Sequence, residues 1–91
     1  MTKYIVKFED KALQDIRKII KSGNKSDKNK LENILEELKS HPFIGSGQPE
    51  QLKHNLSGYW SRRINKKDRL IYKVIEEPDK LVVIISALGH Y

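Results

Sequence analysis

The spacing of apolar residues differs between the two halves of the chain, and this difference limits the folds open to it. Before Pro42, apolar side chains recur at the spacing of one helix face. After Glu50, they occur in short runs separated by turn-forming residues, as in strands. Together with a short alternating segment near the N-terminus, this order predicts an α+β domain in which helices pack on one sheet.

The first half predicts one strand and two helices. Residues 3–8, KYIVKF, alternate as a strand with Tyr4, Val6 and Phe8 on one face. Residues 9–23 predict a helix that ends at KSG, and its expected core stripe consists of Leu13, Ile16, Ile19 and Ile20. A second helix is expected to begin at Ser26 or Asp27 and to stop before Pro42; its stripe consists of Leu31, Ile34, Leu35 and Leu38.

The second half predicts a sheet after a loop with two glycines and two prolines at 40–50. The expected strands are 50–54, 58–65, 69–76 and 80–89, and short turns between them favour an antiparallel meander. We assign Trp60, Leu70 and Tyr72 to the core on the inward face of this meander. No repeat or linker interrupts the sequence, so we expect residues 1–91 to form a single domain.

Composition excludes several kinds of chemistry. The sequence has no cysteine, so it has no disulfide, thiolate zinc site or cysteine nucleophile. No apolar run is long enough for a membrane span or a signal peptide, so we expect no membrane contact and a cytoplasmic location. The formal net charge of +6 favours an anionic partner such as nucleic acid or an acidic protein, although a merely solvated basic surface would have the same charge.

Two arginines are expected to converge on one face of the meander. Alternation places Trp60, Arg62 and Ile64 on one face and Tyr59, Ser61 and Arg63 on the other. If Asn65 faces Arg69 across the following turn, Arg63 and Arg69 become diagonal neighbours. Such a pair either binds an anion such as phosphate or simply points into solvent.

The histidines do not indicate a metal site. His41, His54 and His90 are scattered without the spacing of metal ligands, so we expect neither a metal nor a cofactor. The GSG at 45–47 lacks the flanking elements of a phosphate-binding loop or a nucleophile elbow. Glu50 and His90 remain as a candidate acid and base, provided that the sheet brings them together.

The stretch PFIGSGQPEQLKHNLSGYWSRRINKKDRLIYKV, followed by a terminal GHY, resembles the YoeB (Txe) toxins of bacterial type II toxin-antitoxin systems, within the RelE-like superfamily. The resemblance covers Pro42 to Val74 and the last residues, whereas the N-terminal helices are similar only in pattern and length. It implies a RelE-like fold, similar to that of small microbial ribonucleases. The segment 76–91, EEPDKLVVIISALGHY, departs from the usual last hairpin of the family by a longer route to GHY.

The resemblance also implies an activity and a site. It implies an mRNA interferase, a ribosome-dependent endoribonuclease that cuts mRNA in the ribosomal A site and stops translation. The catalytic positions would be Glu50, Arg69, His90 and Tyr91, and the RNA- or phosphate-binding positions Lys53, His54 and Arg63. Metal-free cleavage needs a base on the 2′-hydroxyl and an acid on the departing 5′ oxygen, roles that suit Glu50 and His90.

Partners follow from the same resemblance. They would be the ribosome and mRNA, a YefM-type antitoxin that silences the toxin, operator DNA only through that antitoxin, and a second copy in a homodimer. Two other functions fit the basic surface without the chemistry: a non-catalytic module that binds RNA or the ribosome, and a protein that only binds an acidic partner.

Overall fold

The computed structural model describes residues 3–53 and 57–89. Within them the chain forms two helices and five strands, which in chain order are β1 (Ile5–Phe8), α1 (Asp10–Lys21), α2 (Lys25–Leu38), β2 (Glu50–Gln51), β3 (Tyr59–Arg63), β4 (Arg69–Ile75) and β5 (Leu81–Gly89). No helix in this part of the chain is long and apolar enough to cross a membrane.

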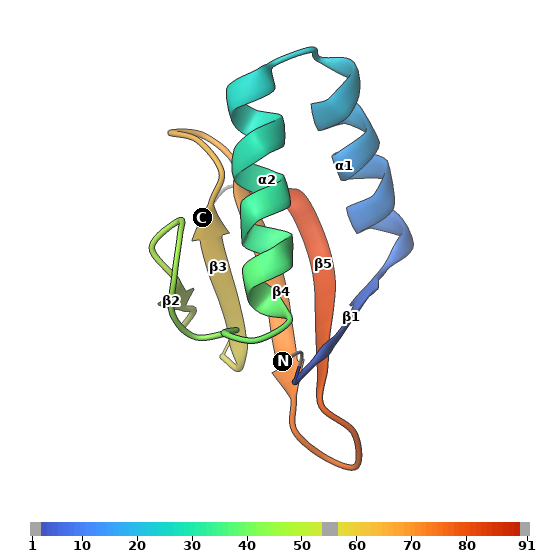
Figure 1. Ribbon diagram of the computed structural model, residues 1–91, viewed down its shortest axis with the longest axis vertical. Helices are drawn as coiled ribbons and strands as arrows, with labels where there is room; N and C mark the ends of the chain where they lie inside the picture. The colour runs from blue at the N-terminus through green and yellow to red at the C-terminus, as the bar shows by residue number, and fades with distance from the viewer. Residues whose placement is uncertain (1–2, 54–56, 90–91) are drawn as a thin grey trace.

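The strands form one mixed sheet in the order β1-β5-β4-β3-β2. Strands β2 to β5 form the predicted antiparallel meander, and β1 joins its far edge by pairing parallel to β5. Both helices cover the same face of this sheet (Figure 1). The α+β class and the packing of helices on a sheet, both expected from the sequence, are thereby confirmed.

Helix α2 supplies the helical half of the core. Its predicted stripe is confirmed, because Leu31, Ile34 and Leu38 are buried in one cluster with residues of the sheet, and Leu35 packs half-buried beside them. The helix begins slightly earlier than expected. Asn24 accepts a hydrogen bond from the Asp27 N–H at 3.0 Å and caps the first turn, so that the helix starts at Lys25.

Helix α1 turns to the sheet a face that only partly matches the predicted one, since Ile19 is buried and Ile16 packs against the core as expected. Ala12, Asp15 and Ile19 are buried, whereas Leu13 and Ile20 are 38% and 51% exposed. The prediction that Leu13 and Ile20 belong to the core is therefore wrong. The helix lies over β5 near the side of the sheet (Figure 1), and its buried stripe includes the small Ala12.

A hydrogen-bonding requirement explains why an aspartate lies in the buried stripe of α1. Asp15 Oδ2 accepts hydrogen bonds from the backbone N–H groups of Ala87 and Leu88 at 3.0 and 3.3 Å and from Lys11 Nζ at 2.8 Å. Burial alone would raise the pKa of this carboxyl, but the three donors outweigh burial and lower it. Asp15 therefore ties α1 to the last part of β5 in its ionised form.

Several strand predictions need correction at their ends. Within the described part of the strand expected at 50–54, only Glu50–Gln51 pair as a strand, and the Leu52 N–H after them donates to the Tyr59 carbonyl at 2.9 Å. The strand expected from Lys3 begins at Ile5; of the residues predicted to share one face, Tyr4 just before it is buried in the core, whereas Phe8 is 38% exposed.

Leu70 and Tyr72 are buried on the inward face of the meander, as predicted. Trp60 is half-buried against the same core, with its ring centroid 5.0 Å from that of Phe43.

Candidate functional site

The face of the sheet opposite the helices carries four of the polar residues of interest. Glu50 pairs with Ser61 across β2 and β3, and Arg63 pairs with Arg69 across β3 and β4. Cross-strand partners share a face, and successive residues of a strand alternate between faces. Because Arg62 points toward α2, these four side chains lie on the side that the helices leave uncovered.

Arg69 makes the central contacts of this face. Its Nη1 donates to Glu50 Oε2 at 3.3 Å and to Ser61 Oγ at 3.2 Å. The side chain of Arg69 is mostly covered, whereas that of Glu50 is 64% exposed. The structure therefore brings Glu50 and Arg69 together, with the carboxylate open to solvent and Ser61 holding the guanidinium from the buried side.

The register of the β3–β4 hairpin differs from the prediction. A hairpin with Asn65 opposite Arg69 would have left Arg63 diagonal to Arg69, but Arg63 is the direct partner of Arg69. The turn is closed by the Ile64 N–H, which donates to the Asp68 carbonyl at 2.9 Å. The Asn65 side chain accepts from the Asp68 N–H at 2.7 Å within the turn, so Asn65 is a turn residue rather than a strand residue.

Irregular pairing brings the end of β5 to Arg69. From Arg69 to Tyr72, β4 advances three residues, while β5 passes from Gly89 to Ile84, and the register shifts twice on the way. Extra residues in one strand bend it and change the direction of its side chains. Gly89 thereby becomes the register partner of Arg69.

Three of the predicted site residues, His54, His90 and Tyr91, lie outside the described residues. Lys53 is exposed just after β2. Within the described part of the chain, no group of three or more histidine, aspartate or glutamate side chains is placed to hold a metal ion.

Arg63 also borders a second basic feature. With Lys30 of α2 and Lys66 of the β3–β4 turn, it lines a shallow hollow of about 340 Å³. Among the described residues, none of these three cations has a carboxylate partner. The hollow therefore extends the positive charge of the face around the edge of the sheet toward α2.

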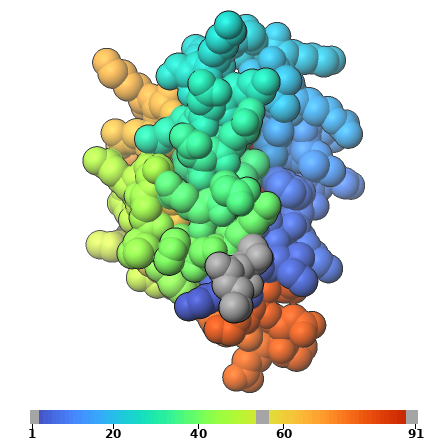
Figure 2. Space-filling view, viewed as in Figure 1, coloured from blue at the N-terminus to red at the C-terminus, as the bar shows by residue number. Residues whose placement is uncertain are grey.

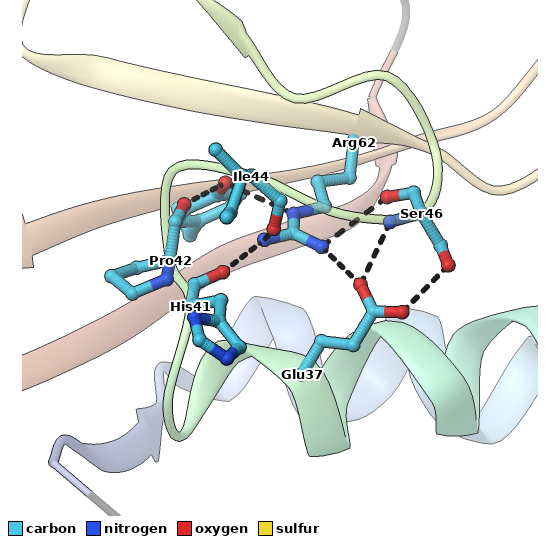
Figure 3. Close-up of polar contacts among 7 residues, drawn as sticks. Glu37, His41, Pro42, Ile44, Ser46 and Arg62 are labelled. Atoms are coloured by element: carbon cyan, nitrogen blue, oxygen red, sulfur yellow. Dashed lines mark hydrogen bonds and ion pairs between the residues drawn. The ribbon is translucent and has the colours of Figure 1, made fainter.

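Behind the candidate site, Arg62 organises the loop that leads to Glu50 (Figure 3). The side chain is fully buried and donates five hydrogen bonds. Nη1 bonds to Glu37 Oε1 at 2.7 Å and to the Ser46 carbonyl at 3.3 Å. Nη2 bonds to the carbonyls of His41 and Ile44, and Nε bonds to the Tyr72 hydroxyl at 3.2 Å.

Glu37 completes this cluster from α2. Its carboxylate accepts hydrogen bonds from the Ser46 N–H at 2.8 Å and the Ser46 hydroxyl at 2.6 Å in addition to Arg62. Burial would raise the pKa of Glu37, but these donors and the charge of Arg62 lower it. Burial raises the pKa of Tyr72, against a smaller opposite effect of Arg62.

Sequence reasoning did not single out Ser61, Arg62 or Asp15. Alternation alone placed Arg62 on the same face as Trp60, which was already assigned to the core. A buried arginine needs an acidic partner, so an arginine at a core-facing position of the sequence is a signal for a buried ion pair. Its partner, Glu37, lies 25 residues earlier in the chain.

Three solved structures of YoeB or YoeB/ParE toxins share this architecture. The YoeB/ParE toxin from Agrobacterium tumefaciens superposes with a TM-score of 0.84 at 28% identity, over 94% of this chain and 98% of that one. A YoeB dimer from Staphylococcus aureus gives 0.80 at 33% identity, covering 98% and 99%. The YoeB-YefM complex from the same species gives 0.77 at 34% identity, covering 97% and 98%.

The sheet order, the two covering helices and these superpositions define a toxin with the RelE-like fold. The profile of the family described as YoeB-like toxin of bacterial type II toxin-antitoxin system matches residues 8–91. The chain belongs to this YoeB toxin family.

Two curated relatives illustrate the range of sequence similarity. Toxin YoeB of Escherichia coli O6:H1 is 44% identical over 62 residues, which is 68% of this chain and 70% of that protein. Toxin YoeB of Mycobacterium bovis is 35% identical over 86 residues, which is 94% of this chain and 96% of that protein. Family membership makes the chain the toxin component of a toxin-antitoxin pair.

Proposed function

We propose that this toxin is a ribosome-dependent endoribonuclease that cleaves mRNA in the ribosomal A site without a metal ion. The observation that carries the proposal is the contact between Glu50 and Arg69 on the uncovered face, with Gly89 paired opposite Arg69. A carboxylate next to a guanidinium supplies the base and the phosphate-binding group that RNA cleavage needs. In sequence, His90 and Tyr91 directly follow Gly89.

The proposed reaction is an attack of the RNA on itself. Glu50 takes the proton of the 2′-hydroxyl, the 2′ oxygen forms a bond to the adjacent phosphorus, and the bond from phosphorus to the 5′ oxygen breaks. His90 donates a proton to that departing oxygen. The products are a 2′,3′-cyclic phosphate and a 5′-hydroxyl, so DNA, which lacks the nucleophile, is not cut.

The remaining residues act on charge and position. Arg69 neutralises the negative charge that grows on the non-bridging phosphate oxygens, an effect on the order of 3 kcal/mol when such a donor is removed. Arg63, Lys53 and His54 bind neighbouring phosphates, and Tyr91 stacks on a base or orients the scissile phosphate.

Primer extension on ribosome-bound message tests the activity. Wild-type toxin should produce cuts within the A-site codon, whereas Arg69→Ala and His90→Ala should slow cutting by at least a hundredfold. Two treatments separate this mechanism from a metal-dependent one. Chelation of divalent ions after ribosome binding should leave cleavage intact, whereas a 2′-O-methyl group at the cut nucleotide should abolish it. The proposal is contradicted if both variants cut message as fast as the wild type does, or if chelation abolishes cleavage while the ribosomes stay intact.

The alternative is a non-catalytic module that binds RNA or the ribosome. The basic hollow beside Arg63 favours this alternative, since it would serve binding without any chemistry. In that case Arg69→Ala would weaken ribosome binding, while the wild type itself would leave the message intact. A ribosome pull-down run beside primer extension distinguishes the two functions.

We infer further that a YefM-type antitoxin binds this chain, that any contact with operator DNA is made through it, and that a homodimer forms. The Staphylococcus aureus complex and dimer, at 34% and 33% identity, support the partner and the dimer. Strand β1 is an edge of the sheet, with Ile5 61% exposed beside a hollow of about 930 Å³ between β1 and α2 that apolar side chains of β1 and charged side chains of α2 line. An exposed apolar edge strand is typical of a surface that a partner covers.

A further inference from the structure

Residues 39–49 connect α2 to β2 without regular structure, and this connection determines where Glu50 lies. Figure 2 shows the segment packed along the flank of α2. The carbonyl groups of His41, Ile44 and Ser46 receive hydrogen bonds from Arg62 rather than from a neighbouring strand. The Pro42 carbonyl receives one from the Tyr72 hydroxyl at 2.6 Å. The path of the loop is therefore specified by two buried side chains of the sheet.

The two glycines of the GSG stretch let the loop approach this cluster. A Cβ on Gly45 would overlap Glu37 Oε1 and stand 3.0 Å from Arg62 Nη1. A Cβ on Gly47 would lie 2.7 Å from the Arg63 carbonyl oxygen, and both glycines have positive φ. The stretch therefore lets the loop pack closely against Glu37, Arg62 and Arg63.

Glu50, the candidate base, follows closely in the chain after the loop residues that Arg62 binds. The Arg63 N–H donates to the Gly47 carbonyl at 2.6 Å, and Glu50, three residues later, pairs with Ser61. Ser61 and Arg63 flank Arg62 on β3 and face the opposite side of the sheet. Strand β3 therefore binds the loop through Arg62 on the face that the helices cover, and it carries Ser61 and Arg63 of the candidate site on the opposite face.

A contribution to stability does not explain well why Arg62 and Glu37 form a buried cluster. A buried ion pair costs desolvation energy that its attraction only roughly repays, and apolar replacements of similar volume are often as stable. Geometry gives a better reason, because a displacement of about 1 Å at a reacting group can reduce a rate about a hundredfold. The guanidinium, with every nitrogen hydrogen-bonded, fixes several backbone carbonyls at once.

We propose that Arg62, held by Glu37, is a positioning residue for RNA cleavage: it fixes the 41–49 loop against β3 so that the Glu50 carboxylate stands beside Arg69. This inference rests on the ribonuclease activity proposed above. Arg62 is shielded from the RNA, so its effect is on the rate of the chemical step and not on binding.

The experiment measures single-turnover cleavage of mRNA on programmed ribosomes with the toxin in excess. The maximal rate and the half-saturating toxin concentration are determined for wild type, Arg62→Met, Glu37→Gln and Gly47→Ala. The controls are Ile19→Val and Ile19→Ala, in the core under α1. Each test variant is compared with the control that has the more similar melting temperature. All assays are run well below the melting temperature.

We expect Arg62→Met and Glu37→Gln to lower the maximal rate at least tenfold, with less than a threefold change in half-saturating concentration. Faster hydrogen exchange at residues 43–50 should accompany the loss, and the Ile19 controls should show neither change. If Arg62→Met does not fold, Glu37→Gln and Gly47→Ala test the inference by the same two measurements.

Cleavage by these variants at the rate of the matched Ile19 control overturns the inference and leaves the proposed function standing. A folded, ribosome-bound wild type that does not cut message overturns the proposed function itself.

Discussion

Arg63 and Arg69 are direct partners across β3 and β4, so two guanidinium groups leave the same face of the sheet at adjacent positions. Like charges directly opposite each other destabilise a strand pair. Arg69 is compensated by Glu50 at 3.3 Å, whereas Arg63 has no carboxylate partner among the described residues. The unpaired guanidinium of Arg63 is therefore a favourable binding position for an oxyanion.

A divalent oxyanion should therefore stabilise the protein through Arg63. Sulfate should raise the melting temperature of the wild type above its value in chloride at the same ionic strength. Arg63→Gln should remove most of this difference while changing stability in chloride by less than about 1 kcal/mol, because the side chain is exposed. Differential scanning fluorimetry across a sulfate series measures the effect, and an equal sulfate response in Arg63→Gln would contradict it.

Ser61 should matter more for cleavage than for folding. Ser61→Ala removes the hydrogen bond that holds Arg69 Nη1 from the buried side, so the guanidinium should be less well placed for the phosphate. We expect about a tenfold lower single-turnover rate and a loss of about 1 kcal/mol in the free energy of unfolding.

Ser86→Ala is the matched control, since Ser86 is also a buried serine of the sheet, and the hydrogen bonds of Arg69 in the described part of the chain go to Glu50 and Ser61. Equal cleavage rates in the two alanine variants would show that Ser61 has only a structural role.

The basic hollow beside Arg63 should contribute to ribosome affinity through charge alone. The double variant Lys30→Glu, Lys66→Glu should raise the half-saturating ribosome concentration and make it less dependent on salt, because fewer counterions are released on binding. The maximal cleavage rate should stay within about threefold of wild type.

Lys7→Glu combined with Lys18→Glu makes the same change in net charge at exposed positions of β1 and α1. A titration of labelled ribosomes at several potassium chloride concentrations compares the two double variants. Identical salt dependence would show that the hollow acts only through the total charge.

Asp15 should make stability depend on pH in the acid range. Its folded-state pKa is lowered, so the unfolded chain binds its proton first as the pH falls. The stabilisation is complete well above the ordinary value of 3.8 and is lost as the pH falls through the lower folded-state value. Urea unfolding from pH 6 to pH 2 should show a shallower decline for Asp15→Asn than for wild type.

The same substitution should cost about 1–3 kcal/mol at pH 6, since the buried N–H groups of Ala87 and Leu88 lose a charged acceptor. Asp79→Asn, exposed between β4 and β5, is the control. If Asp15→Asn follows the wild-type decline, the acid dependence arises elsewhere, with Glu37 as the next candidate.

Much of the candidate site could be predicted from the sequence. Glu50, Arg63 and Arg69 were singled out, and Glu50 and Arg69 prove to be in contact. The register of the hairpin could not be predicted, because it depends on how Asn65 and Asp68 close the turn. The roles of Glu50, Lys53, His54, Arg63, Arg69, His90 and Tyr91 remain predictions for the experiments above.

The sequence by itself determined the α+β class, the apolar stripe of α2 and the antiparallel meander of the second half, because hydrophobic period and turn residues act over short stretches of chain. Only the tertiary structure decided which face of α1 is buried and which partners hold Arg62 in the interior. Those outcomes depend on partners far away in sequence: Ala87 and Leu88 for Asp15, and Glu37 for Arg62. A buried charge is tolerated only where folding brings such partners to it.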